Sequence, residues 1–220
     1  MTTLAHLNTQ VLQLLADPAG IRYPGELVTE AIRQALQEYS TAWPQVKVAG
    51  LTVTQPGQAQ SLAGLAGLQA VLRLVYPYTP GEIDPPPWAA YWYYWADGRP
   101  VVQIQGASPQ AGQQLQVTYA AAHSLQDLDG APLTTVRPDH LPILATGAAG
   151  LAAVMRASGV AESYASRSSD PSQLLEWGGA QLLEFRSRLR ELKITARQMP
   201  GVLPAAGWTL DRWDRRLGDE

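Results

Sequence analysis

The sequence contains no cysteine, and this absence excludes three kinds of chemistry at once. Disulfide bridges, thiolate metal ligands and thiol nucleophiles all require that residue. Histidine is scarce, with three residues in 220, so imidazole-based sites have little material. Phosphate-binding glycine loops and HExxH pairs are absent, and "GASPQ" is not the GxSxG turn of a serine nucleophile. We therefore expect no enzyme, no cofactor and no metal site.

A strong charge of either sign is also absent. The net charge is −3, so the chain has no global basic field that would bind nucleic acid indiscriminately. The apolar run from Leu141 to Met155 is shorter than the ~20 residues of a membrane-spanning helix. The N-terminal stretch "MTTLAHLNTQ" lacks the basic and apolar regions of an export signal. We therefore expect no membrane segment, and we expect the protein to be first present in a cytoplasm.

Hydrophobic spacing divides the chain into helical and extended parts. Apolar residues recur at helical spacing in residues 4–15, 25–42, 139–158 and 171–198. Beginning at Val46, the spacing changes to the alternation of strands closed by turns. The sequence thus predicts an α+β fold. We expect a bundle of about four helices in residues 1–45 and 124–199, an inserted antiparallel β domain in residues 46–123, and a C-terminal arm in residues 200–220.

The most unusual segment is "PPPWAAYWYYWADG", residues 85–98, because both faces of a strand here would be aromatic. A strand on a solvated sheet alternates apolar with polar residues. This strand is therefore either central in a sandwich or covered on one face by another molecule. A stacking platform for sugars or bases is a third interpretation. The residues assigned to subunit or sheet packing are Trp88, Tyr91, Trp92, Tyr93, Tyr94 and Trp95.

The last predicted helix carries a basic stripe beside its apolar seam. The stripe consists of Arg186, Arg190, Lys193 and Arg197, at spacings of three and four residues. Charge at helical spacing suits contact with DNA phosphates in a channel or with an acidic protein surface. Because Glu184 and Glu191 are interspersed, a solvated helix face explains the same pattern.

Two further features have structural and functional interpretations. Gly147, Gly150 and the neighbouring alanines let two helices approach closely, either within a subunit or between subunits. Asp139 and His140 are adjacent, but "RPDHLP" is more typical of the lead-in to a helix than of a catalytic pair.

The C-terminal arm combines large apolar residues with arginines. Prolines at 200 and 204 end the preceding helix, and the short segment beyond them has few residues to bury tryptophans. We expect it to order on docking to a portal or to a neighbouring ring, since tryptophan and arginine often dominate interfaces. The residues assigned to this contact are Trp208, Leu210, Arg212, Trp213, Arg215 and Arg216.

The order of several segments resembles the head-to-tail adaptor proteins of tailed bacteriophages, also called connector, head-completion or neck proteins. The segments are "LVTEAIRQALQEYSTAWP", "LAGLAGLQAVLRLVYP", "LQVTYAAAHSL" and "TTVRPDHLPILATGAAGLAA", which together span about residues 24–160. The aromatic strand and the long proline loop depart from the family pattern.

This resemblance implies a structural virion protein rather than an enzyme. Such proteins form a ring, typically twelve-fold, beneath the portal, and they join the capsid to the tail while genomic DNA passes through without sequence recognition. The implied partners are the portal, a tail or nozzle protein below, and further copies of the chain. The implied location is the virion neck, assembled in the host cytoplasm. The alternative function is a carbohydrate- or nucleic-acid-binding module that uses the aromatic strand as a platform.

Overall fold

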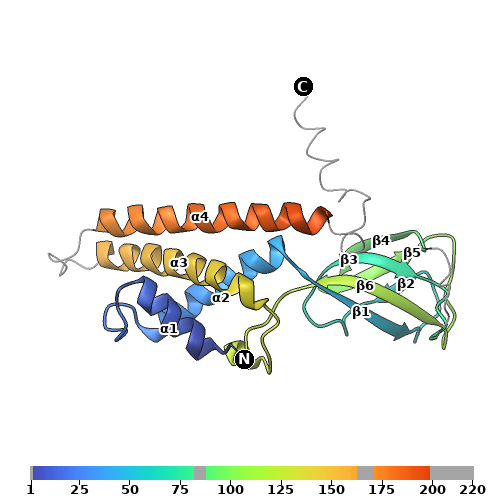
Figure 1. Ribbon diagram of the computed structural model, residues 1–220. Helices are drawn as coiled ribbons and strands as arrows, with labels where there is room; N and C mark the ends of the chain where they lie inside the picture. The colour runs from blue at the N-terminus through green and yellow to red at the C-terminus, as the bar shows by residue number, and fades with distance from the viewer. Residues whose placement is uncertain (1, 82–87, 163–170, 199–220) are drawn as a thin grey trace. The chain divides into compact units, whose positions relative to one another are not determined.

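The computed structural model describes residues 2–81, 88–162 and 171–198, and the chain divides into two compact units (Figure 1). The first unit comprises residues 1–45 and 121–194, and it contains the helices. The second comprises residues 46–120 and 195–220, and its strands lie between the second and third helices in the sequence. The predicted α+β class is confirmed.

Helices α1 and α2 open the helical unit. α1 spans Leu4–Leu14, and the Thr3 hydroxyl caps it by accepting a hydrogen bond from the backbone N–H of His6 at 3.3 Å. α2 spans Gly25–Ala42. It begins after Pro24 and ends two residues before Pro44, which cannot continue a helix. The apolar stripe of α2 is buried, as its periodicity predicts: Val28, Ala31, Ile32, Ala35, Leu36 and Tyr39.

The long helices α3 and α4 complete this unit. A short 3₁₀ turn at Pro138–His140 leads into α3, Leu141–Glu162, and α4 spans Pro171–Gln198. The helix at residues 138–159 is long and apolar enough to cross a membrane, but 56% of that stretch is buried inside the fold. Its alanines at 145, 148, 149, 152 and 153 are all buried in the core. We therefore interpret α3 as the core helix of this unit.

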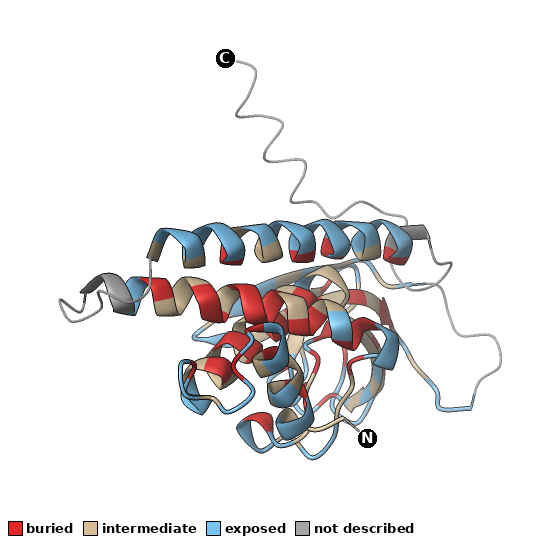
Figure 2. Ribbon diagram, turned by 60° about the vertical axis from the view of Figure 1, so that its left-hand side comes forward, coloured by how far each residue is buried: buried red, intermediate tan, exposed pale blue. Residues whose placement is uncertain are grey.

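α4 lies along α3, and two glycines of α3 make the close approach possible (Figures 1 and 2). A Cβ atom on Gly147 would lie 2.7 Å from the ring of Phe185, a distance shorter than carbon atoms adopt in non-bonded contacts. A Cβ atom on Gly150 would lie 3.0 Å from the backbone oxygen of Gly178. Of the two interpretations of these small residues, the structure supports packing within one subunit.

The second unit contains two three-stranded sheets. One has the order β1-β6-β3, formed by Gln45–Thr52, Gln114–Ala121 and Leu68–Val75. The other has the order β2-β5-β4, formed by Ala59–Ser61, Arg99–Ile104 and Tyr91–Ala96, with antiparallel pairing throughout. The segment "SLAGLAGL", residues 61–68, contains turns between the end of β2 and the beginning of β3 and no helix.

A two-residue turn joins β4 to β5 and fixes their register. Asp97 and Gly98 both have positive φ, 49° and 71°, which is the conformation of the tightest antiparallel hairpins. Glycine adopts it without steric cost, and aspartate tolerates it. The register places Trp92 opposite Gln103 and Tyr94 opposite Val101.

Candidate functional site

The aromatic strand β4 lies at the edge of its sheet and exposes one face. Trp92 and Tyr94 of β4 are exposed, with Trp92 at 63%, and so is Trp88, which precedes the strand and bridges to Val75 of β3. We call these three residues the aromatic face. Ala89, Tyr91 and Tyr93 alternate with them and are half-buried. The Tyr91 hydroxyl donates a hydrogen bond to the Val71 carbonyl at 2.9 Å, and burial raises the pKa of this phenol. The strand therefore has one face turned to the protein and one turned outward.

The cross-strand neighbours repeat this division. On the inner face of the same sheet, Val102 and Ile104 of β5 are fully buried, and Gln60 of β2 is also buried. On the outer face, the partners of Trp92 and Tyr94 are Gln103 and Val101, which are half-buried. A position at the centre of a sandwich, one alternative left open by the sequence, is therefore wrong for β4. Trp95 lies on the inner side by alternation, yet it is 62% exposed because it stands at the turn.

One ring of the aromatic face already has a partner. The guanidinium of Arg73 lies over the Trp88 ring, 4.2 Å from its centroid, in a cation–π contact. The two remaining members, Trp92 and Tyr94, alternate along β4 and make no cation–π contact within the described residues. Exposed apolar patches on a folded chain mark sites of protein or ligand contact.

The basic stripe of α4 is exposed, but one of its members has an internal partner. The Arg186 guanidinium donates two hydrogen bonds, both 3.2 Å, to the Glu38 carboxylate of α2. This contact raises the pKa of Arg186. Arg190 and Lys193 are exposed and form no ion pair within the described residues. The side chain of Arg197 lies outside the described residues.

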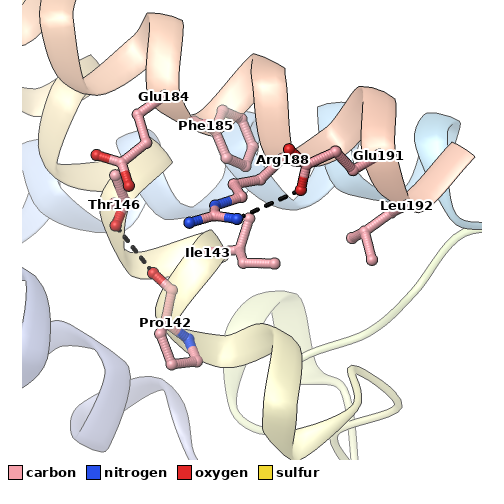
Figure 3. Close-up of a pocket in the computed structure, with 8 residues that line it drawn as sticks. All are labelled: Pro142, Ile143, Thr146, Glu184, Phe185, Arg188, Glu191 and Leu192. Atoms are coloured by element: carbon pink, nitrogen blue, oxygen red, sulfur yellow. Dashed lines mark hydrogen bonds and ion pairs between the residues drawn. The ribbon is translucent and has the colours of Figure 1, made fainter.

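The opposite flank of α4 is hollowed and carries carboxylates, as Figure 3 shows. Here a pocket of about 350 Å³ lies between the beginning of α3 and the middle of α4. Arg188 reaches across it and donates a hydrogen bond to Glu191 at 3.3 Å. The pocket is lined by Pro142, Ile143, Thr146, Glu184, Phe185, Arg188, Glu191 and Leu192.

Sequence reasoning missed this flank. It treated Glu184 and Glu191 as charges that dilute the basic stripe, whereas the helix places them on its other side. The signal was present in their spacing of seven residues, which returns side chains to nearly the same side of a helix.

The adjacent Asp139 and His140 do not form a catalytic pair. The His140 Nε2 atom lies 3.8 Å from an Asp139 oxygen, beyond hydrogen-bond distance, and Asp139 instead accepts two hydrogen bonds from Arg137. Burial lowers the pKa of His140, so the neutral ring is favoured. Burial also raises the pKa of Tyr39 to about 12, and its hydroxyl forms a hydrogen bond of 2.7 Å with His140 Nδ1. The buried Tyr39–His140 pair therefore stabilises the core of the helical unit.

No group of three or more potential metal ligands occurs in residues 2–81, 88–162 and 171–198. Asp129, for example, forms an ion pair with Arg33 at 2.7 Å. The proposed contact residues of the arm, Trp208 to Arg216, lie outside the described part of the chain.

Similar chains occur in solved structures of particle necks. One is the neck of an empty GTA particle computed with C6 symmetry, at 16% identity and a TM-score of 0.31, covering 77% of this chain and 87% of that chain. Another is the neck of a native GTA particle computed with C12 symmetry, at 16% identity and a TM-score of 0.31, covering 80% and 91%. No family model and no curated protein matches. Superposition at this TM-score is too loose to carry an argument about function.

Proposed function

We propose that this chain is a structural virion protein, a head-to-tail adaptor that forms a ring beneath the portal of a tailed phage particle. The ring, twelve-fold by the sequence resemblance, joins the capsid to the tail and lets genomic DNA pass through its centre. The portal, a tail or nozzle protein and neighbouring copies are its partners, and the virion neck is its location.

The observation that carries the proposal is the aromatic face of β4. A folded subunit that leaves Trp92 of the edge strand 63% exposed, and Trp88 just before that strand 61% exposed, has an apolar surface in water. When another protein covers such a surface, the complex is stabilised by roughly 25 cal/mol for each Å² of apolar area removed from water. Tryptophan and tyrosine are also enriched where proteins meet. A ring offers each subunit a neighbour that covers this face.

The proposal is tested by the assembly state of the purified protein. We expect negative-stain images and native mass spectrometry to show closed rings of uniform size, either alone or with the portal of the same particle. The double variant Trp92→Ser/Tyr94→Ser should remain folded by circular dichroism but assemble poorly. A wild-type chain that stays monomeric at high concentration and does not bind the portal would contradict the proposal.

The alternative is a stacking platform for sugars or nucleic-acid bases on the same face. It needs exposed rings with free faces, and the contact of Arg73 with Trp88 occupies one of them. Tryptophan fluorescence distinguishes the two functions, since a platform predicts saturable changes with oligosaccharides or oligonucleotides. The adaptor proposal predicts no such change in the presence of these small ligands.

The arm completes the proposed contact with the portal. Trp208, Leu210 and Trp213 supply apolar anchors, and Arg212, Arg215 and Arg216 supply charge. Deleting residues 205–220 should leave the thermal stability of the free subunit nearly unchanged and abolish portal binding. A truncated chain that unfolds easily, or one that still binds the portal, would refute this role.

A further inference from the structure

Helix α4 carries opposite charges on its two flanks. Its inner line, Gly178, Phe185 and Leu189, is buried against the rest of the helical unit. At 100° per residue, Lys193, Arg186 and Arg190 lie about 60–120° from that line in one direction. Glu191 and Glu184 lie about 120–140° from it in the other direction, and Arg188, which pairs with Glu191, lies about 80° from it on that same side. Figure 2 shows the outward surface of α4 as exposed along the helix.

The two flanks have matching spacing. Glu184 and Glu191 are seven residues apart, and so are Arg186 and Lys193, which corresponds to about 10.5 Å along the axis in both cases. One axial offset of two residues, about 3 Å, therefore aligns both charge pairs between two parallel copies of α4. Charges at this spacing set the partner and register of helices that lie side by side.

Apolar groups accompany the charges on both flanks. Leu183 is 70% exposed and stands next to the basic flank, one turn from Arg186. The pocket on the acidic flank is lined on its apolar side by Ile143, Phe185 and Leu192. Its volume of about 350 Å³ is ample for a leucine side chain. One flank thus presents a basic rim with an apolar knob, and the other an acidic rim with an apolar hollow.

We propose that the basic flank of α4 in one copy packs against the acidic flank of α4 in the next copy, a contact that rests on the proposed ring. Arg186 faces Glu184 and Lys193 faces Glu191 of the neighbour. Two different flanks that bind each other form a head-to-tail interface, and repeating it by rotation closes a ring. The internal pairs Arg186–Glu38 and Arg188–Glu191 do not prevent this, because exposed ion pairs contribute little and exchange partners readily.

Charge reversal tests the charge pairing. The variant Arg186→Glu/Lys193→Glu reverses the two basic partners, and Glu184→Lys/Glu191→Lys reverses the two acidic partners. Each variant alone should lose ring assembly at least tenfold at physiological salt, whereas an equimolar mixture should restore rings in which the two variants alternate. The variant Arg186→Lys/Lys193→Arg keeps the charges and should assemble like the wild type.

Cysteine cross-linking tests the head-to-tail geometry, since the natural chain has no cysteine. Lys193→Cys and Glu191→Cys lie on opposite flanks, so a chain with both should give a ladder of multimers under a mild oxidant such as copper phenanthroline. Each single variant should stay monomeric, and a mixture of the two should stop at dimers. Dimers from a single variant would show a two-fold contact and overturn the proposal.

The remaining outcomes separate this contact from the adaptor function. Rings that form equally well in all charge variants overturn the α4 contact and leave the adaptor proposal standing. Rings that persist in Arg186→Glu/Lys193→Glu but no longer retain DNA assign the basic flank to the channel instead. A wild-type chain that gives neither rings nor cross-linked ladders overturns both.

Discussion

The crossing of α3 with α4 and the outer face of β4 are both apolar, but only the crossing is covered within the chain. At the crossing, the ring of Phe185 lies so close to Gly147 that a side chain at position 147 would not fit. On β4, Trp92 and Tyr94 extend outward without cover. The difference teaches that apolar composition alone does not locate the core, and that large residues left outside are surfaces for a partner.

Enlarging Gly147 should give the largest effect on the stability of the subunit. A Gly147→Val side chain would overlap the Phe185 ring, and we expect the free energy of unfolding to fall by about 3 kcal/mol, near the upper end for overpacking. Thermal denaturation by circular dichroism measures it. Gly179→Ala in α4 is the matched control, because nothing lies within 4 Å of its Cβ position, and it should stabilise the helix by about 1 kcal/mol. Equal melting temperatures for the two variants would contradict the prediction that the crossing of α3 with α4 leaves no room for a side chain at position 147.

Removing the Tyr39 hydroxyl should have a smaller effect. Tyr39→Phe leaves the Nδ1 atom of buried His140 without its 2.7 Å hydrogen-bond partner, and we expect the free energy of unfolding to fall by about 1–3 kcal/mol. Urea denaturation of the purified variant gives the value. The same substitution at the partly exposed Tyr76 is a control for loss of a hydroxyl outside the helical core. A Tyr39→Phe chain as stable as the wild type would mean that the histidine finds another hydrogen-bond partner.

The same histidine predicts a pH dependence. Burial lowers the pKa of His140 below its ordinary value of 6.5, so the unfolded chain takes up the proton first as the pH falls. Stability from this group is therefore complete above pH 6.5 and declines below it. Between pH 7.5 and 5, the melting temperature should fall less steeply for His140→Asn than for the wild type, because the variant lacks this titrating group. His6 and His123 are unchanged in both chains. Parallel curves would assign the pH dependence to other groups.

Substitution on the aromatic face should have the smallest effect on the isolated subunit. Trp92→Thr replaces an exposed side chain by another residue that favours strands, so the free energy of unfolding should change by no more than about 0.5 kcal/mol. Assembly, measured by mass photometry, should weaken in the same variant. A large loss of stability would show that Trp92 supports the fold of its own chain.

The sequence predicts the helices well and the surfaces poorly. The apolar period of α2 and the prolines at both its ends define its extent, and the same argument holds for α4 from Pro171. For β4, alternation separates Trp92 and Tyr94 from Tyr91 and Tyr93, but it does not say which side is buried. That depends on the edge position of the strand, which follows from tertiary pairing. The pocket at Glu184 could not be predicted either, because three of its eight lining residues come from α3.

The pairing of β1 with β6 has a consequence for how the chain is built. The backbone N–H of Val53 donates to the Gln113 carbonyl at 2.8 Å, so these strands run in opposite directions and Gln45 and Ala121 are the neighbouring ends of the inserted segment. Paired strands lie about 4.8 Å apart. The β unit is thus an inserted segment whose first and last residues are close neighbours. We expect that a few glycines joining Gln45 to Ala121 would close the host chain, so that either unit can be replaced without redesigning the other.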